Sequence, residues 1–314
     1  MTLDITADRN GSAPAATPAH SLSAPSSVRG MTMLVASTVF FAGSDAVTKL
    51  LSAGLPTGEI VWLRYLTFAV LTLALVARHG GTALLRSRNA GLQILRGVAL
   101  LGSTIAFTTA LRFLPVADAT AIYFISPFLI MALSIVFLGE TVGWRRWTAA
   151  GIGLVGVLIV IRPGTGAFQT AAVLPLVGAA CWASAAIVTR KMSGGDSALT
   201  TLAYSAMVGL VGMSFALPFV WVTPSLSEVL LGAGIGVLSA IGHWFVIQAY
   251  RYANASTIAP FAYVQMIWAG LLGYLVFSAL PDTWTVVGAG IIAASGLYTA
   301  YRERVRALQA RATA

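Results

Sequence analysis

The sequence predicts an all-α integral membrane protein with ten transmembrane helices, arranged as two inverted repeats of five helices. Hydrophobic residues make up 58% of the 314 residues, and charged residues only 9%. So few charges cannot cover the surface of a soluble protein of this size. The apolar residues form continuous runs close to the length of about 20 residues that a membrane-spanning helix needs. The second half of the chain also weakly echoes the first.

Ten apolar runs are separated by short segments that carry most of the basic residues. The runs do not alternate with period two, so they predict helices rather than the strands of a barrel. The predicted helices cover residues 31–50, 58–77, 92–111, 118–138, 144–161, 171–190, 198–221, 229–250, 256–277 and 283–301. Residues 1–29, rich in Ala, Ser, Pro and Thr, predict a disordered tail. Residues 302–314 predict a basic, polar tail.

The Lys and Arg residues predict the orientation of the helices. Ten spans place both ends of the chain on one side, and fifteen of the nineteen Lys and Arg residues, Arg96 among them, then fall on that side. Lys49, Arg112 and Arg162 fall on the opposite side, and Arg64 falls within the second helix. Cytoplasmic loops carry the excess of Lys and Arg, so both termini are predicted to be cytoplasmic, in a bacterial inner membrane. The net charge of +9 is therefore a topology signal and does not indicate nucleic-acid binding.

The internal echo has an offset of 139–141 residues and predicts repeats at residues 30–162 and 163–301. Phe41-Ala42-Gly43-Ser44 is echoed by Trp182-Ala183-Ser184-Ala185, Val47-Thr48-Lys49 by Val188-Thr189-Arg190, and Ala110-Leu111-Arg112-Phe113 by Ala249-Tyr250-Arg251-Tyr252. Chance similarity between Ala-, Gly- and Leu-rich helices is the alternative explanation. A repeat of five helices turns the second half over in the membrane. Many secondary transporters have this arrangement, with the binding site near the midplane between the repeats.

Three segments resemble the drug/metabolite transporter superfamily, in its ten-helix, two-repeat (EamA-like) branch. They are residues 110–122, Ser126-Pro127 and Leu138-Gly139-Glu140. The resemblance covers about residues 31–301 and implies the export of amino acids, other small metabolites or toxic cations, or the import of nucleoside-like or vitamin-like compounds. The second repeat departs from the pattern, because Ser278-Ala279 stands where Gly139-Glu140 would recur. Any role of the glutamate is thus confined to the first half.

Charged residues inside a bilayer are costly, so each one is a candidate functional residue. Asp45 and Lys49 lie four positions apart on one face of the first helix. They predict either a local ion pair or a cavity-lining Asp45 that binds a proton or a cationic substrate group. Arg64 is expected to pair with Glu59 or Asp45, or to clamp a substrate carboxylate. Lys49, Glu59, Arg64 and Glu140 are the candidates for charge pairing or gating.

Other polar and aromatic residues lie deep within the predicted helices. His243 predicts either a titratable group in the cavity or a packed histidine bonded to a neighbouring helix. The aromatic residues predict cavity walls or packing against neighbouring helices and lipid. The candidate substrate-binding residues are Asp45, Tyr123, Trp182, His243, Tyr263 and Gln265.

Two prolines and one glutamate mark interruptions or ends of helices. Pro127 and Pro260 are predicted to kink the fourth and ninth helices, which correspond under the repeat. Interrupted helices at corresponding places indicate the binding site of a transporter. Glu140 precedes Arg145 and Arg146 and predicts an interfacial charge cluster rather than a site.

These features predict a secondary transporter that exports amino acids by alternating access. Uptake of a larger, nucleoside-like or vitamin-like metabolite is the alternative. The H-E-x-x-H, G-x-S-x-G and S-x-x-K motifs of enzymes and the glycine-rich loop of ATP-driven pumps are missing from the sequence. No catalytic residue, cofactor or metal site is predicted. The expected partners are a small-molecule substrate, the lipid bilayer and, as a candidate coupling ion, a proton, for a monomer or a homodimer.

Overall fold

The computed structural model describes residues 24–162, 170–278 and 282–312. Helix is the only regular secondary structure within these ranges. The α-helices are α1 (Ala24–Leu51), α2 (Thr57–His79), α3 (Ala90–Phe113), α4 (Val116–Tyr123), α5 (Ser126–Leu138), α6 (Trp144–Ile161), α7 (Val173–Lys191), α8 (Ala198–Ala216), α9 (Leu226–Tyr252), α10 (Ala255–Ile258), α11 (Val264–Phe277) and α12 (Thr283–Ala312). Short 3-10 helices are η1 (Gly81–Leu85), η2 (Thr170–Ala172), η3 (Leu217–Phe219) and η4 (Ala259–Tyr263).

Eight helical segments of the described ranges are long and apolar enough to cross a membrane. They include Val116–Leu138, which is built from α4 and α5, and Ala255–Phe277, which is built from α10, η4 and α11. Two further helices are apolar over shorter stretches, Trp147–Ile159 in α6 and Thr283–Gly296 in α12. Each predicted range therefore contains helix, although Val220 and Trp221 at the end of the range 198–221 are not helical, and eight of the helical segments qualify as spans by length and composition.

The first and last helices extend beyond their predicted boundaries. α1 begins at Ala24, so residues 24–29 of the predicted disordered tail are helical. Pro25 lies in the first turn, where its missing N–H breaks no helical hydrogen bond. α12 continues to Ala312 through most of the predicted polar tail, because Arg, Ala, Leu, Glu and Gln all favour helix. Residues 1–23 and 313–314 of the predicted tails lie outside the described residues.

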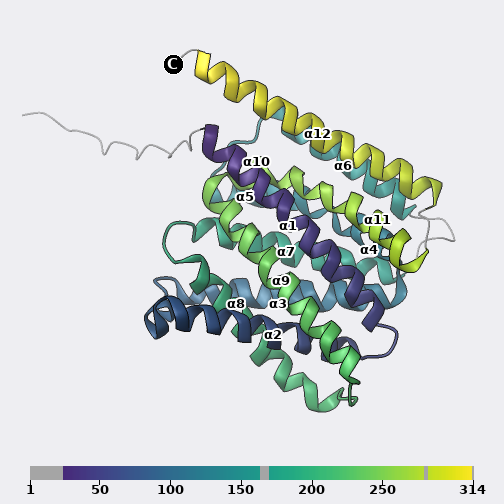
Figure 1. Ribbon diagram of the computed structural model, residues 1–314. Coiled ribbons are helices and arrows are strands. Elements are labelled where there is room, and N and C mark those ends of the chain that lie inside the picture. The colour runs from purple at the N-terminus through teal and green to yellow at the C-terminus, as the bar shows by residue number, and fades with distance from the viewer. Residues whose placement is uncertain (1–23, 163–169, 279–281, 313–314) are drawn as a thin grey trace, which may run out of the picture.

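Corresponding helices of the two halves make corresponding contacts. Under the sequence echo, α1 corresponds to α7 and α3 to α9; α1 packs along α9, and α7 packs along α3. α6 lies beside α12 at one edge, and α2 packs against α8 at the opposite edge (Figure 1). A Cβ at Gly156 of α6 would lie 2.8 Å from the carbonyl oxygen of Gly288 in α12. A Cβ at Gly209 of α8 would lie 2.2 Å from the Tyr65 ring of α2, so glycine permits the close approach at both edges.

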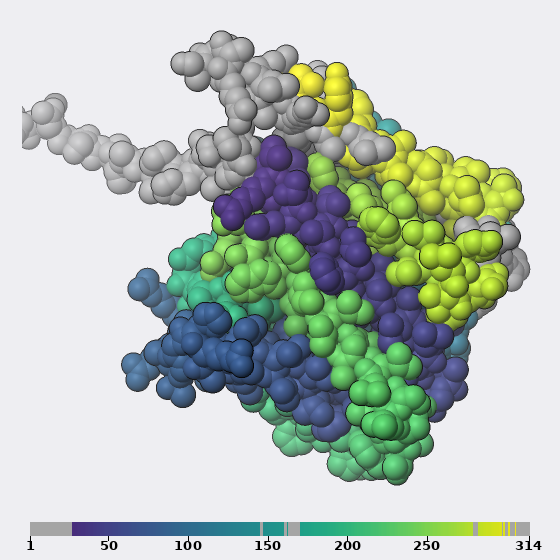
Figure 2. All heavy atoms as spheres, viewed as in Figure 1, coloured from purple at the N-terminus to yellow at the C-terminus, as the bar shows by residue number. Residues whose placement is uncertain are grey.

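Large apolar side chains cover the outside of the helices. Val70, Val136, Phe215 and Leu275 are 59% to 77% exposed. Soluble proteins rarely expose contiguous apolar patches of large size, whereas a lipid bilayer solvates them. On the face shown in Figure 2, α1 forms a diagonal band between α9 and α11, and it packs against both.

Two corresponding spans are interrupted near their middle. α4 ends at Tyr123 and α5 begins at Ser126, with Pro127 as its second residue. In the second half, Pro260 lies within η4, between α10 and α11. Proline lacks the N–H that a continuous helix needs at these points. Residues at both interruptions line the cavity between the two halves.

Candidate functional site

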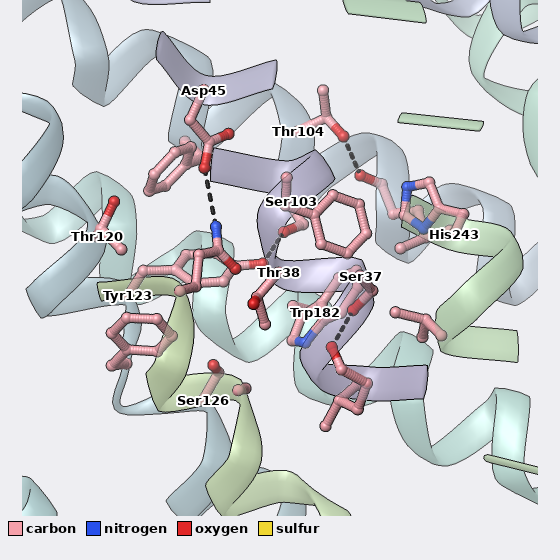
Figure 3. A pocket seen from close by; sticks show the side chains of 18 of the residues that line it. Ser37, Thr38, Asp45, Ser103, Thr104, Thr120, Tyr123, Ser126, Trp182 and His243 are labelled. Carbon is pink, nitrogen blue, oxygen red and sulfur yellow. Dashed lines mark hydrogen bonds between the residues drawn. The ribbon is translucent and has the colours of Figure 1, made fainter. Parts of the chain in front are cut away.

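A central cavity lies between the two halves and is lined by helices of both. Its empty volume is about 870 Å³, which includes the open space at its mouth. The lining includes the predicted residues Asp45, Tyr123, Trp182, His243 and Gln265, together with Arg64. It also includes hydroxyl side chains that are not among the predicted binding residues: Ser37, Thr38, Ser103, Thr104, Thr108, Thr120 and Ser126, most of which are labelled in Figure 3.

Asp45 supplies a carboxylate to the cavity wall. It is 8% exposed, and its Oδ2 accepts a hydrogen bond of 3.0 Å from Nε2 of Gln265, which links α1 to α11 (Figure 3). Arg64 of α2 lines the same cavity and is close enough for its charge to act on Asp45. The two form no ion pair among the described residues. The cavity therefore presents a carboxylate and a guanidinium group that do not bind each other.

Lys49 does not form the predicted local pair with Asp45. Its Nζ donates hydrogen bonds to the carbonyl oxygens of Leu111 and Leu114, at 2.5 and 3.1 Å. These carbonyls belong to the C-terminal end of α3, where a cation compensates for the unpaired carbonyls and the helix dipole. Asp45 instead has the arrangement of the other alternative, a carboxylate that lines the cavity.

Glu59 does not pair with Arg64 either. Side chains five positions apart lie on different faces of a helix, and Glu59 is fully buried away from the cavity lining. Its Oε2 accepts a hydrogen bond of 3.1 Å from the backbone N–H of Val222. Its Oε1 is buried and has no hydrogen-bond partner among the described residues. Glu59 thus connects α2 to the segment between α8 and α9.

The hydroxyl groups of the lining bind one another and neighbouring rings. The hydroxyls of Tyr123 and Ser103 lie 2.9 Å apart, and the Tyr123 ring packs edge-to-face against Phe107, with the centroids 5.0 Å apart. Ser and Thr also occur at ordinary contacts between membrane helices. Their presence in a sequence therefore does not distinguish a cavity wall from a packing surface.

An aromatic cluster encloses His243. Phe68 stacks on the imidazole with the centroids 5.6 Å apart, Phe41 approaches edge-to-face at 5.1 Å, and Trp182 lies at 5.9 Å. His243 is 3% exposed, and its Nδ1 is buried without a hydrogen-bond partner in the described part of the chain. The predicted bond to a neighbouring helix is therefore wrong for this nitrogen. Phe41 and Trp182, which correspond under the repeat, also meet edge-to-face at 5.7 Å.

Tyr263 lies outside the cavity lining, contrary to the prediction. It is 3% exposed, and its ring contacts Phe124 edge-to-face at 5.5 Å. A Cβ at Gly153 of α6 would lie 2.9 Å from its hydroxyl oxygen, so Tyr263 fills the space between η4 and α6. The 3-10 geometry of η4 turns successive side chains by a larger angle than an α-helix does. Of the two expectations for aromatic residues, Tyr263 thus has the second, packing against a neighbouring helix.

Glu140 connects the two halves. The side chains of Arg145 and Arg146, with which it is predicted to form an interfacial cluster, lie outside the described residues. Its carboxylate accepts hydrogen bonds from the backbone N–H groups of Ala255 and Ser256, at 3.1 and 3.0 Å. The Ser256 hydroxyl donates a further bond of 2.5 Å. Glu140 therefore binds the N-terminal residues of α10.

Arg190 of α7 corresponds to Lys49 of α1 and acts in the same way. Its Nη1 donates to the Tyr250 carbonyl oxygen at 2.9 Å, and its Nη2 donates to Oδ1 of Asn254 at 2.6 Å. Arg190 thus binds the C-terminal end of α9, as Lys49 binds that of α3. Its Nε also lies 4.0 Å from Oε1 of Glu140.

Arg96 is a buried charge that the orientation count placed at the cytoplasmic surface. It is 1% exposed within α3. Its Nε donates to the Thr189 hydroxyl at 2.7 Å, and its Nη1 donates to the Ser205 hydroxyl. Hydroxyls of α7 and α8 thus provide the polar partners that allow burial of the guanidinium group.

Asp196, in the connection between α7 and α8, binds the first half of the chain. Its carboxylate accepts hydrogen bonds from the Ser87 hydroxyl at 2.5 Å, the Arg88 N–H at 2.9 Å and Nε2 of Gln93 at 2.9 Å. Burial opposes ionisation of this carboxyl, but these hydrogen bonds hold the pKa of Asp196 below its usual range.

The cavity offers a carboxylate, a guanidinium group, an imidazole, an amide and several hydroxyls between aromatic walls. The described residues contain no group of three His, Cys, Asp or Glu side chains arranged to hold a metal ion. Separate opposite charges and flat apolar surfaces suit an organic ligand that combines both features.

Comparison with known proteins identifies transporters as relatives. The S-adenosylmethionine uptake transporter of Rickettsia prowazekii is 28% identical over 278 residues, covering 88% of this chain and 94% of that protein. The riboflavin transporter of Vibrio cholerae is 29% identical, covering 85% and 91%. The pseudopaline exporter of Pseudomonas aeruginosa is 28% identical, covering 84% and 93%. A protein crystal structure with 16% sequence identity has the same fold, with a TM-score of 0.72, covering 90% of this chain and 98% of that chain.

The EamA-like transporter family matches the sequence twice, over residues 28–162 and 169–301. The two matches correspond to the two halves that the sequence echo predicts, and the cavity lies between these halves. The chain therefore belongs to the EamA-like transporter family and is a membrane transporter built from two repeats.

Proposed function

We propose that the chain is an alternating-access secondary transporter with ten spans in two inverted repeats. α6 and α12 have shorter apolar stretches, but we count both as membrane spans because they pack along each other as part of the helix bundle. The matching contacts of α1 with α9 and of α7 with α3 support a two-fold relation between the halves, and five spans per half make that relation an inversion. Both termini are placed in the cytoplasm by the excess of Lys and Arg on their side. The Arg190 end of the cavity then faces the cytoplasm.

The substrate carries an α-amino-acid head group. The observation behind this proposal is that Asp45 and Arg64 line one cavity without binding each other. A carboxylate is a partner for an ammonium group, and the planar guanidinium group of Arg binds a carboxylate through two hydrogen bonds. A zwitterion placed between them would satisfy both charges, which are costly to leave unpaired in a low-dielectric cavity.

Two substrate classes fit this head group. Amino acids, whose export the sequence predicts, carry it, and so does S-adenosylmethionine, whose uptake transporter is a relative. Riboflavin lacks it, so a riboflavin-like vitamin is the competing class, supported by the riboflavin transporter among the relatives. Export stays a prediction, because the relatives include both an uptake transporter and an exporter.

Flux into and out of liposomes that contain the purified protein tests the proposal. The labelled panel contains methionine, phenylalanine, S-adenosylmethionine, adenosine and riboflavin, each measured in both directions. We expect protein-dependent flux of compounds with the amino-acid head group. Flux of riboflavin or adenosine without flux of any amino-acid-bearing compound would contradict the proposal.

Variants of the two charges make the test specific. Asp45→Asn and Arg64→Met should each lower the affinity for head-group substrates about 10- to 100-fold, the cost of losing a hydrogen bond to a charged group. Arg112→Met is the matched control, because Arg112 binds the Leu55 carbonyl oxygen and does not line the cavity. If a proton is coupled through Asp45, Asp45→Asn also abolishes the effect of a pH gradient on flux.

A further inference from the structure

The cavity that Asp45 lines also contains a polar group without a partner. His243 lines the cavity, is 3% exposed and has a buried Nδ1 without a hydrogen-bond partner among the described residues. The corresponding residue of the first half is Thr104 at an offset of 139, and its hydroxyl lies 3.3 Å from the Tyr65 hydroxyl. The two halves therefore differ at this position: the hydroxyl is partnered and the imidazole nitrogen is not. A buried polar atom without a partner costs free energy that a ligand can recover.

The surroundings of His243 indicate what kind of ligand group would bind there. Phe41, Phe68 and Trp182 pack around the imidazole with centroid distances of 5.1 to 5.9 Å, and Phe41 and Trp182 also line the cavity. Flat aromatic surfaces bind other flat rings by stacking. An uncharged imidazole offers one hydrogen-bond donor and one acceptor, which match the ring nitrogens and amino groups of a nitrogen heterocycle.

A cation is the other group that aromatic rings attract. The Asp45 carboxylate of this cavity is assigned to the ammonium of the head group, and Arg64 of the same lining carries a positive charge that repels a further cation. The charges of the cavity thus favour a neutral heterocycle over a second ammonium or sulfonium group.

The cluster also lies at a suitable distance from the charged groups. Phe41 and Asp45 are four positions apart on α1, so they lie on one face, about 6 Å apart along the axis. A molecule with a head group at Asp45 can therefore reach the cluster through a linker of a few bonds.

We infer that His243 and Trp182 bind a planar nitrogen heterocycle, of the purine class, that the substrate carries in addition to its amino-acid head group. The inference rests on the proposed function, which assigns the head group to Asp45 and Arg64. It makes His243 a residue that distinguishes a nucleobase-bearing amino acid from a plain amino acid.

Binding measurements on the purified full-length protein with a set of four compounds test this inference. S-adenosylhomocysteine has the heterocycle and the head group without a sulfonium charge, and S-methylmethionine has the sulfonium and the head group without a heterocycle. Methionine has the head group alone, and adenosine has the heterocycle alone. We expect S-adenosylhomocysteine to bind at least about 10-fold more tightly than methionine or S-methylmethionine, the gain of one hydrogen bond with stacking.

Variants of His243 identify the residue responsible. His243→Phe keeps a ring in the aromatic cluster and removes both nitrogens, so it should weaken S-adenosylhomocysteine about 10-fold and leave methionine unchanged. His243→Asn keeps a donor and an acceptor and should recover part of the loss. His79→Phe is the matched control, since His79 is exposed at the end of α2 and bonds the Leu75 carbonyl oxygen. Unchanged methionine binding also shows that each variant is folded.

The outcomes separate this inference from the proposed function. If methionine and S-adenosylhomocysteine bind equally well to the natural protein, or if His243→Phe weakens both equally while its melting temperature is unchanged, the heterocycle site is refuted and the head-group proposal stands. If S-methylmethionine binds as tightly as S-adenosylhomocysteine, the cluster is a cation site. If no compound with a head group binds, both the proposed function and the inference fail.

Discussion

At the Lys49 end of the cavity, Lys49 binds the C-terminus of α3, and Glu59 accepts one hydrogen bond from the opposite half, from Val222. At the Arg190 end, Arg190 binds the C-terminus of α9, and Asp196 accepts three hydrogen bonds from the opposite half. At the Lys49 end, Asp118 binds Thr285 and Arg162 pairs with Asp282 across the halves, and this ion pair is partly exposed. At the Arg190 end, the Glu140 carboxylate crosses from the first half to α10, where it accepts three hydrogen bonds. The residue that corresponds to Glu140 in the second half is an alanine.

The two ends therefore share their helix-capping cations and differ in the contacts that cross between the halves. Hydrogen bonds to a charged group each contribute about 1.5–3 kcal/mol, and a buried polar atom without a partner costs about 1–3 kcal/mol. Crossing contacts must break when an end opens. Opening of the Lys49 end releases Glu59, Asp118 and the exposed Arg162–Asp282 pair, which contributes little to stability. We expect this end to open at the lower cost, whereas opening of the Arg190 end requires release of Glu140 and Asp196.

The largest expected effect is that of Arg190→Met. It removes the cap of α9 and leaves the partly buried Glu140 carboxylate without its neighbouring positive charge, so the free energy of unfolding should fall by about 3 kcal/mol. Lys49→Met is the matched variant and should cost about 1 kcal/mol, since only carbonyl groups lose their partner. Thermal unfolding in detergent measures both. If both variants lower the free energy of unfolding equally, the contact of Arg190 with Glu140 adds nothing to the capping that both cations provide.

Glu140→Gln should lower the free energy of unfolding by about 2 kcal/mol, because the amide replaces an ionised acceptor of several hydrogen bonds. Glu228→Gln is the control: Glu228 also binds a helix N-terminus, with Ser225, but in an exposed position. It should cost less than about 1 kcal/mol. If Glu140→Gln lowers the free energy of unfolding by no more than the control does, Glu140 does not contribute to the difference between the two ends.

The two crossing carboxylates at the starts of α2 and α8 should respond in opposite directions. Asp196→Asn replaces a carboxylate with three hydrogen-bond donors around it and should cost about 1 kcal/mol. Glu59→Gln removes a buried charge with one donor and one unpartnered oxygen, so the melting temperature should stay equal or rise. A clear loss of stability for Glu59→Gln would show that the Lys49 end depends on this charge.

The smallest effect is a dependence on pH at the Arg190 end. The pKa of Asp196 is lower in the folded protein than its usual value, which is about 3.9. Its contribution to stability is therefore complete above about pH 5 and is lost as the pH falls through the folded pKa. The difference in melting temperature between the natural protein and Asp196→Asn should be constant from about pH 8 to 6 and shrink below about pH 4. Shrinkage between pH 8 and 6 would contradict the assignment.

Several features of the site could be predicted because they are local. The lengths of the apolar runs predict where each helix lies, since a bilayer requires about 20 apolar residues whatever the neighbouring helices are. Asp45, His243 and Gln265 stand out because polar groups are costly at this depth. Pro127 and Pro260 identify the interrupted helices because proline lacks an N–H. These residues all lie at the cavity or beside it.

The partner of each charge could not be predicted in the same way. Lys49 binds Leu111, 62 residues away, and Asp45 binds Gln265, 220 residues away. Tyr263 packs against Gly153 of α6, 110 residues away, and does not line the cavity.

Sequence alone thus determined the membrane class, the positions of the helices and which buried groups need a partner. These properties depend on the residue and its solvent. The tertiary structure decided which partner each group has, that Glu140 crosses between the halves and that His243 has an unpartnered nitrogen in the cavity wall. These contacts depend on how helices distant in sequence pack together, which no local pattern contains.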